Sequence, residues 1–244
     1  MNTIVILKQS IKLFGNPNGH YDCKFNRIVK LAGNYNNLLT KFDTFINKCS
    51  LTDRSRHALA CKLLMFTGIR IGNEDSAEGY IAKNKQREGE FVQTFGLTTL
   101  KKEHIIIEKN VVYLNFLGKR QVGQSIKITD KVLVKQITTV YNSNNDTELF
   151  LNITDYSLRR FIKKYVGKNF KAKDFRTLRA NIDGYLFVEE LKKRTLNTRK
   201  SQVNAEVKEL TVHVSNILGN TPGITKKSYI DDQLINYTIN ERMK

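Results

Sequence analysis

One tyrosine near the C-terminal end of the chain stands where its phenol could act as a nucleophile. Tyr229 follows the run Leu-Gly-Asn-Thr-Pro, which begins at Leu218, and it comes directly after Lys226, Lys227 and a serine. A phenol is protonated and weakly nucleophilic at neutral pH, and nearby cations favour the phenolate. The stretch therefore fits attack on a phosphate. The alternative is an ordinary half-buried tyrosine, since the chain contains ten.

Basic residues earlier in the chain have types and settings suited to a phosphate. Arg70 lies between two glycines after an apolar stretch, Lys119 and Arg120 lie at the tip of a glycine-bounded turn, and Arg176 lies in a basic helix start. A guanidinium binds phosphate oxygens through two parallel hydrogen bonds, and an ammonium can donate a proton. Cations at a helix start oppose the helix dipole unless an anion binds there. For Arg70 and for the turn of Lys119 and Arg120, the alternative is a solvated loop or turn residue.

The elements that position these residues follow from the hydrophobic periodicity. Apolar spacing of three and four predicts helices over residues 24–49, 53–67, 130–141, 154–165, 171–193 and 199–219, and a tail helix beyond 232. Thr221 can cap a further short helix with Pro222 in its first position, which places Tyr229 about two turns in. Alternation predicts three antiparallel strands over residues 105–107, 111–117 and 124–128. The fold class is therefore α+β, mostly helical with a small three-stranded antiparallel sheet.

The charge balance indicates a polyanionic partner. Lys and Arg total 41 against 23 acidic residues, which gives a net charge of +18. Such an excess most often serves nucleic acid binding. The three cysteines lack metal-ligand spacing and predict reduced thiols in an intracellular protein. The four histidines are scattered, and neither a metal site nor a phosphate-binding glycine loop is evident, so the expected phosphate chemistry uses no metal and no nucleotide.

The order of these motifs resembles that of the type IB DNA topoisomerases, in particular their small poxviral and bacterial forms. The matching runs are TGIRIGNE around Arg70, FLGKRQV around Lys119, KDFRTLRAN around Arg176, and LGNTP followed by a tyrosine nine residues after its asparagine. The segment Gly96–Ile105 is also similar to the family's segment ahead of the catalytic hairpin. The resemblance covers about residues 24–232.

The resemblance implies a role for each catalytic residue. Tyr229 is the nucleophile that forms a 3′-phosphotyrosine with DNA. Arg70 and Arg176 stabilise the pentavalent transition state, and Lys119 is the general acid that protonates the leaving 5′ oxygen. Asn220 stands where the poxviral enzymes carry a histidine, and an amide can donate a hydrogen bond but adds no positive charge.

The resemblance also implies a partner and a domain organisation. Lys173, Asn181 and Arg120 are expected DNA contacts, the partner is duplex DNA, and no cofactor, metal, ATP or membrane is required. We expect a short N-terminal arm over residues 1–21 and a catalytic domain over 22–244, in which residues 75–95 form a long exposed loop. The N-terminal clamp domain of the family is expected to be absent or supplied elsewhere, by a second chain or by the loop of residues 75–95. The place of action is the bacterial cytoplasm or, for a virus, the virion or viral factory.

Two alternatives share parts of this pattern. A tyrosine recombinase or integrase carries the same order of Arg, Lys, Arg and Tyr, but usually has His-x-x-Arg at the second arginine, where this chain has Lys173. A catalytically inactive DNA-binding protein would keep the positive charge, but the complete set of catalytic side chains argues against it.

Overall fold

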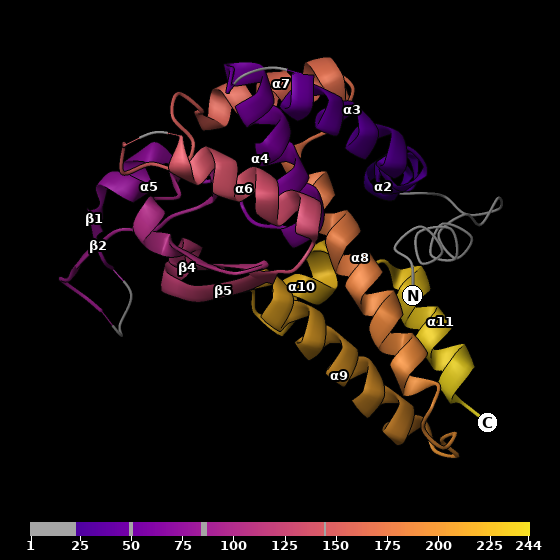
Figure 1. Cartoon of the computed structure of the whole chain (residues 1–244). Helices are drawn as coiled ribbons and strands as arrows, with labels where there is room; N and C mark the ends of the chain where they lie inside the picture. Colours follow the sequence, from indigo (N-terminus) through magenta and orange to yellow (C-terminus); the bar gives the residue numbers. More distant parts are fainter. Residues whose placement is uncertain (1–22, 49–50, 84–86, 144) are drawn as a thin grey trace. The chain divides into compact units, whose positions relative to one another are not determined.

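A computed structural model describes residues 23–48, 51–83, 87–143 and 145–244 (Figure 1). The chain divides into two compact units, residues 38–172 and residues 1–37 together with 173–244. Both units contribute residues to the range 22–244 of the predicted catalytic domain. The predicted arm over residues 1–21 lies outside the described residues.

The unit of residues 38–172 contains most of α3 (Tyr35–Lys48) and the helices α4 (Asp53–Thr67), α5 (Glu74–Glu78), α6 (Lys131–Asn142) and α7 (Asp155–Tyr165). The predicted ends of α4 are confirmed. The Thr52 hydroxyl accepts a hydrogen bond from the Ser55 N–H, and Gly68 closes the helix in the left-handed region with a φ of 63°. The apolar faces of these helices form the core of this unit, with Leu59, Leu63, Leu133, Ile137 and Leu158 fully buried.

The predicted three-stranded sheet is confirmed, with the order β3-β4-β5. Its strands are β3 (Ile105–Glu108), β4 (Val111–Gly118) and β5 (Val122–Ile128), and both pairings are antiparallel. Alternate residues of β4, namely Val112, Leu114 and Phe116, are buried, as the period of a strand requires. The sheet therefore packs one face inside the unit and carries the β4–β5 turn outward.

The segment 75–95, which was expected to form a long exposed loop, contains most of α5 and a two-stranded ribbon. The ribbon pairs β1 (Tyr80–Ile81) with β2 (Phe91–Val92). The Thr94 N–H donates to the Ser76 carbonyl at 2.8 Å, which fastens the base of the ribbon to α5. Backbone pairing of residues far apart in the segment gives it structure that periodicity over so few residues cannot reveal.

The other unit contains α2 (Cys23–Gly33) and the helices α8 (Ala172–Leu191), α9 (Lys200–Leu218), α10 (Pro222–Ser228) and α11 (Asp232–Arg242). The single helix expected over residues 24–49 is two helices, which meet at Asn34. Gly184 of α8 allows close packing, since a Cβ there would lie 2.7 Å from Leu234 of α11 and 3.3 Å from Leu210 of α9. No described helix is long and apolar enough to cross a bilayer.

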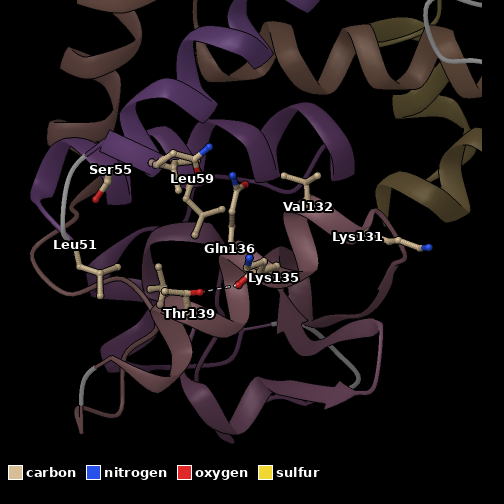
Figure 2. A pocket seen from close by; sticks show the side chains of 11 residues that line it. Leu51, Ser55, Leu59, Lys131, Val132, Lys135, Gln136 and Thr139 are labelled. Atoms are coloured by element: carbon tan, nitrogen blue, oxygen red, sulfur yellow. Dashed lines mark hydrogen bonds between the residues drawn. The ribbon is translucent and has the colours of Figure 1, made fainter.

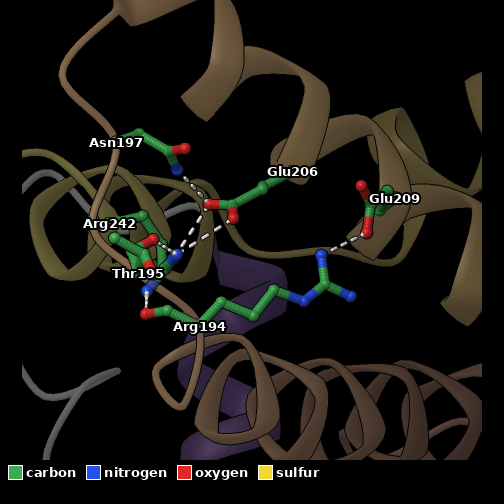
Figure 3. A network of polar contacts seen from close by, with 6 residues as sticks. All are labelled: Arg194, Thr195, Asn197, Glu206, Glu209 and Arg242. Atoms are coloured by element: carbon green, nitrogen blue, oxygen red, sulfur yellow. Dashed lines mark hydrogen bonds and ion pairs between the residues drawn. The ribbon is translucent and has the colours of Figure 1, made fainter.

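A fully buried arginine fastens the end of α11 to α9 and to the α8–α9 connection (Figure 3). The Arg242 guanidinium donates to both carboxylate oxygens of Glu206, at 2.9 and 3.1 Å, and to the carbonyl of Arg194 at 3.0 Å. It also donates to the Thr195 carbonyl, and Asn197 donates to Glu206 at 2.7 Å. The tail helix, in which the sequence showed no chemistry, is thus held by a satisfied buried ion pair.

Replacement of Arg242 tests this ion pair. Arg242→Met leaves the Glu206 carboxylate buried without its counter-ion, and we expect the free energy of unfolding to fall by about 3–5 kcal/mol. Urea denaturation followed by circular dichroism measures it. The exposed pair of Arg194 and Glu209 is the control, because Arg194→Ala should cost less than about 1 kcal/mol. Equal losses of unfolding free energy in the two variants would show that burial of the Arg242–Glu206 pair does not make it more important for stability than an exposed pair.

Candidate active site

Arg70 is held in position by the backbone on which it lies. The chain leaves α4 at Gly68 and runs without regular secondary structure to Asn73, the cap of α5. The Arg70 carbonyl accepts a hydrogen bond from the Leu97 N–H at 2.8 Å, and the Ile71 carbonyl accepts from both the N–H and the hydroxyl of Thr98, at 2.6 and 2.9 Å. These bonds hold the backbone of Arg70 firmly, and its side chain is half-buried.

Two glycines make this contact possible. Gly72 has a φ of 108°, and a Cβ on Gly96 would lie 2.5 Å from the Gly72 backbone and 2.8 Å from the Arg70 carbonyl oxygen. Real Cβ atoms do not approach a backbone so closely. The residue types at both positions therefore fix how near the segment 96–98 comes to Arg70.

Lys119 and Arg120 lie at the tip of the β4–β5 hairpin, as predicted. Gly118 pairs with Val122, so Lys119–Gln121 form a three-residue turn, and both basic side chains are exposed. Arg120 and Gln121 have φ values of 62° and 61°, a left-handed conformation that costs a residue with a side chain about 1 kcal/mol. The turn thus carries backbone strain, which is a common property of functional sites.

A cavity of about 660 Å³ brings Arg70, Lys119 and Arg120 together. Its wall also contains Arg159 of α7, which pairs with Asp155 at 3.2 Å. Four basic side chains and one carboxylate around one hollow suit an anion with several oxygens. The sequence pattern does not single out Arg159, because its place beside Arg70 depends on the packing of α7.

A buried histidine lies beside this cavity. The ring of His104 is 4.3 Å from that of Phe95, which lines the cavity, and its Nδ1 accepts the Lys101 N–H at 3.0 Å. Burial lowers the pKa of His104, so the ring stays neutral at neutral pH and keeps its acceptor. It therefore supports the loop structurally and adds no charge to the cavity.

In the other unit, the run LGNTP fixes the turn between α9 and α10. Gly219 is left-handed, with a φ of 58°, and its N–H and that of Asn220 bond back to Asn216 and Ser215, at 3.2 and 3.0 Å, in a Schellman ending. Thr221 then caps α10 as predicted, with Pro222 in the first position. Asn220 is consequently held at the junction and is half-buried.

Tyr229 is the residue that ends α10, and its N–H still bonds to the Thr225 carbonyl at 3.0 Å. It is only 8% exposed. The Lys173 ammonium and the Arg176 guanidinium lie over its ring, 5.0 and 5.4 Å from the centroid. The tyrosine is therefore buried as the alternative expected, but it is buried beneath two cations from the start of α8.

The two cations have different surroundings. Arg176 is 4% exposed and donates to the Leu218 carbonyl, one of the last carbonyls of α9, where positive charge is favoured. Lys173 is exposed. Between them, buried Asp174 pairs with Arg27 of α2 at 3.2 Å, which anchors the first turn of α8. The basic helix start is thus stabilised by a carboxylate as well as open to an anion.

Asn181 holds the backbone on both sides of Ile230. Its amide nitrogen donates to the Tyr229 carbonyl at 2.8 Å, and its amide oxygen accepts the Asp231 N–H at 2.9 Å. Its side chain is 1% exposed. Burial and these bonds use the amide to position the tyrosine, and the expected contact between Asn181 and DNA stays a prediction.

The structure thus gathers the predicted residues into two sets. Arg70, Lys119 and Arg120 share the cavity of one unit, and Lys173, Arg176, Asn181 and Tyr229 lie together in the other, with Asn220 at the turn before α10. Each set offers cations, and one offers a phenol. Within the described ranges, no three His, Cys, Asp or Glu side chains come close enough to hold a metal ion.

A second side of α7 is also basic. Arg160, Lys163, Lys164 and Lys168 line an open hollow with His57, Phe161 and Tyr165, and the lining contains no carboxylate. Lys164 lies 5.3 Å from the Tyr165 ring centroid. Cations beside aromatic rings suit nucleic acid backbones and bases.

The chain is similar to known DNA topoisomerases over most of its length. The family model described as "Eukaryotic DNA topoisomerase I, catalytic core" matches residues 19–244. The DNA topoisomerase 1B of Acanthamoeba polyphaga mimivirus is 27% identical over 200 residues, which are 75% of this chain and 53% of the relative. The DNA topoisomerase 1B of vaccinia virus (strain Western Reserve) is 27% identical over 203 residues, which are 80% of this chain and 58% of the relative. The chain spans little more than half the length of these relatives.

Among solved structures, the XerH site-specific recombinase bound to its difH substrate is similar at a TM-score of 0.45. It is 16% identical, and the match covers 83% of this chain and 52% of that one.

The glycine contact beside Arg70 gives a testable consequence. Gly96→Ala forces apart two backbones that touch, and we expect it to lower the free energy of unfolding by about 1–3 kcal/mol. Gly123→Ala is the matched control, since a Cβ there meets nothing within 4 Å, and it should change stability by less than about 0.5 kcal/mol. Urea denaturation of both variants measures the difference. A Gly96→Ala protein as stable as the control would show that the contact is unimportant.

Proposed function

Because the chain belongs to the DNA topoisomerase I catalytic-core family, we propose that it is a type IB DNA topoisomerase. It relaxes supercoiled duplex DNA by cutting one strand through a 3′-phosphotyrosyl intermediate, allowing rotation, and rejoining the strand. The observation that carries the proposal is the position of Tyr229, which lies under the cations of Lys173 and Arg176 and is fixed by the amide of Asn181.

The chemistry needs one bond exchanged for another. The Tyr229 phenol gives up its proton to the solvent as its oxygen bonds to the phosphorus, the bond from phosphorus to the 5′ oxygen breaks, and Lys119 gives that 5′ oxygen a proton. Rejoining reverses these steps. The phosphotyrosine bond keeps the free energy of the broken phosphodiester bond, so rejoining consumes no ATP. An alkoxide is a poor leaving group, which makes a positioned proton donor valuable. Neither a metal nor a nucleotide has a step to perform.

The arginines carry the charge of the transition state. Arg70 and Arg176 hold the non-bridging oxygens through their planar guanidinium groups. Asn220 donates a neutral hydrogen bond.

The duplex is bound mainly through its phosphates. The net charge of +18 favours contacts to the backbone that weaken as salt rises. Exposed Lys173 and Arg120 are proposed to contact phosphates beside the cleaved one, and Arg159 joins them. A second chain that completes the grip around the duplex, and action in a bacterial cytoplasm or a viral factory, remain predictions.

A tyrosine recombinase is the second candidate, because it uses the same kinds of catalytic groups. It joins specific paired sites, whereas a topoisomerase relaxes any supercoiled plasmid. A catalytically inactive DNA-binding protein would do neither. Plasmid relaxation therefore separates the three.

Replacement of the nucleophile is the direct test. We expect the protein to relax a supercoiled plasmid in EDTA without ATP, and Tyr229→Phe to abolish relaxation and the covalent adduct with DNA, because phenylalanine has no attacking oxygen. Tyr237→Phe is the control, since its phenol bonds only to Glu189 and Lys192 among the described contacts. Gel electrophoresis measures both products. Relaxation by the Tyr229→Phe protein would rule out the assigned nucleophile.

The proposed role of Lys119 as general acid can be tested with a leaving group that needs no proton. We expect Lys119→Ala to slow cleavage of a suicide substrate by about 10²–10⁴-fold. A 5′-bridging sulfur in place of the oxygen should restore most of the rate, because a thiolate leaves without a proton. Lys127→Ala, on the same hairpin, should cleave both substrates normally. If sulfur does not rescue the Lys119→Ala protein, Lys119 acts in another way.

A further inference from the structure

An apolar groove in the unit of residues 38–172 has no role in the chemistry described above. It has a volume of about 700 Å³ and lies between α6 and the facing ends of α3 and α4 (Figure 2). Leu59, Val140 and Ile46 supply apolar walls with Leu51. None of its lining residues lines the cavity of Arg70 and Lys119.

The polar atoms at the floor of the groove are already bonded within the protein. Gln136 accepts from the buried Lys62 ammonium at 2.8 Å and donates to Asp43 at 2.8 Å, and Lys62 also donates to Asp43 at 2.6 Å. The Ser55 hydroxyl donates to the Thr52 carbonyl at 2.8 Å. These polar atoms need no hydrogen bonds from a ligand. The part of a ligand that enters the groove must therefore be apolar.

The open side of the groove has a different character. Val132 is 52% exposed at the start of α6, and Lys131 and Lys135 beside it are exposed, one helical turn apart. The lining includes these two lysines and no carboxylate. An occupant is therefore favoured if it carries negative charge next to its apolar surface.

The groove also has a helical repeat. Val132, Gln136 and Val140 line it at successive turns of α6, a span of about 12 Å, or two turns of helix. This length and shape suit side chains at positions i, i+3 or i+4, and i+7 of a second helix.

We propose that this groove is a docking site for an acidic amphipathic helix of a partner protein. Apolar side chains of the partner fill the groove against Leu59 and Val132, and its flanking carboxylates pair with Lys131 and Lys135. The site would connect the protein to another protein while the cavity of Arg70 and Lys119 stays open.

A fluorescein-labelled synthetic helix tests the proposal by fluorescence anisotropy without DNA. The probe has leucines at positions i, i+3 and i+7 flanked by glutamates. A scrambled peptide of the same composition has no apolar stripe and controls for attraction to a chain of charge +18. We expect the protein to bind the probe at least about tenfold more tightly than the scrambled peptide. Equal binding of the two peptides would overturn the proposal.

Variants of the groove locate the binding. Val132→Ser, at an exposed position, should weaken the probe about tenfold or more. The pair Lys131→Glu and Lys135→Glu should weaken it similarly and favour a version of the probe with lysines in place of glutamates. The matched charge control is the double variant Lys200→Glu and Lys208→Glu in the other unit. This variant should still bind the probe more tightly than the scrambled peptide. If the groove variants keep that preference unchanged, the peptide binds elsewhere and the proposal fails.

Discussion

Two backbone hydrogen bonds from the segment 95–97 determine where the cations of one unit lie. The Leu97 N–H bonds to the Arg70 carbonyl at 2.8 Å, and the Phe95 N–H bonds to the Leu117 carbonyl at 2.7 Å, two residues before Lys119. Like charges repel, so side chains such as Arg70 and Lys119 converge only where the backbone holds them. Main-chain bonds serve this purpose without adding carboxylates that would neutralise the cavity.

Around Tyr229, too, hydrogen bonds to the backbone hold the side chains in place. Asn181 bonds to the backbone on either side of it, and Arg176 bonds to the end of α9, so the phenol, the guanidinium and the turn before α10 share one support. The Arg242–Glu206 pair fastens the far end of the same helices. The groups that we propose to react are therefore placed by residues with no part in the proposed chemistry. Preorganisation of this kind is what transition-state stabilisation requires.

Much of the fold could be predicted from the sequence because its signals are local. Thr52, Thr221 and Gly219 act within one helical turn of themselves, and the alternation in Val111–Leu117 marks a strand that the structure confirms. The ribbon within residues 75–95 was not predicted, because its two-residue strands are defined by their pairing alone. The break in the helix at Asn34 was missed because the apolar spacing continues across it.

The sequence by itself determined which chemical groups the protein has and in what order: Arg70, Lys119, Arg176 and Tyr229, with a large excess of positive charge. Only the tertiary structure decided that Arg159 joins the first cavity, that Asn181 is buried as a support, and that Gly96 sets the approach to Arg70. The physical reason is the distance along the sequence over which each property is determined. Side-chain chemistry and helix caps are properties of a few neighbouring residues, whereas burial and convergence depend on which distant segments pack together.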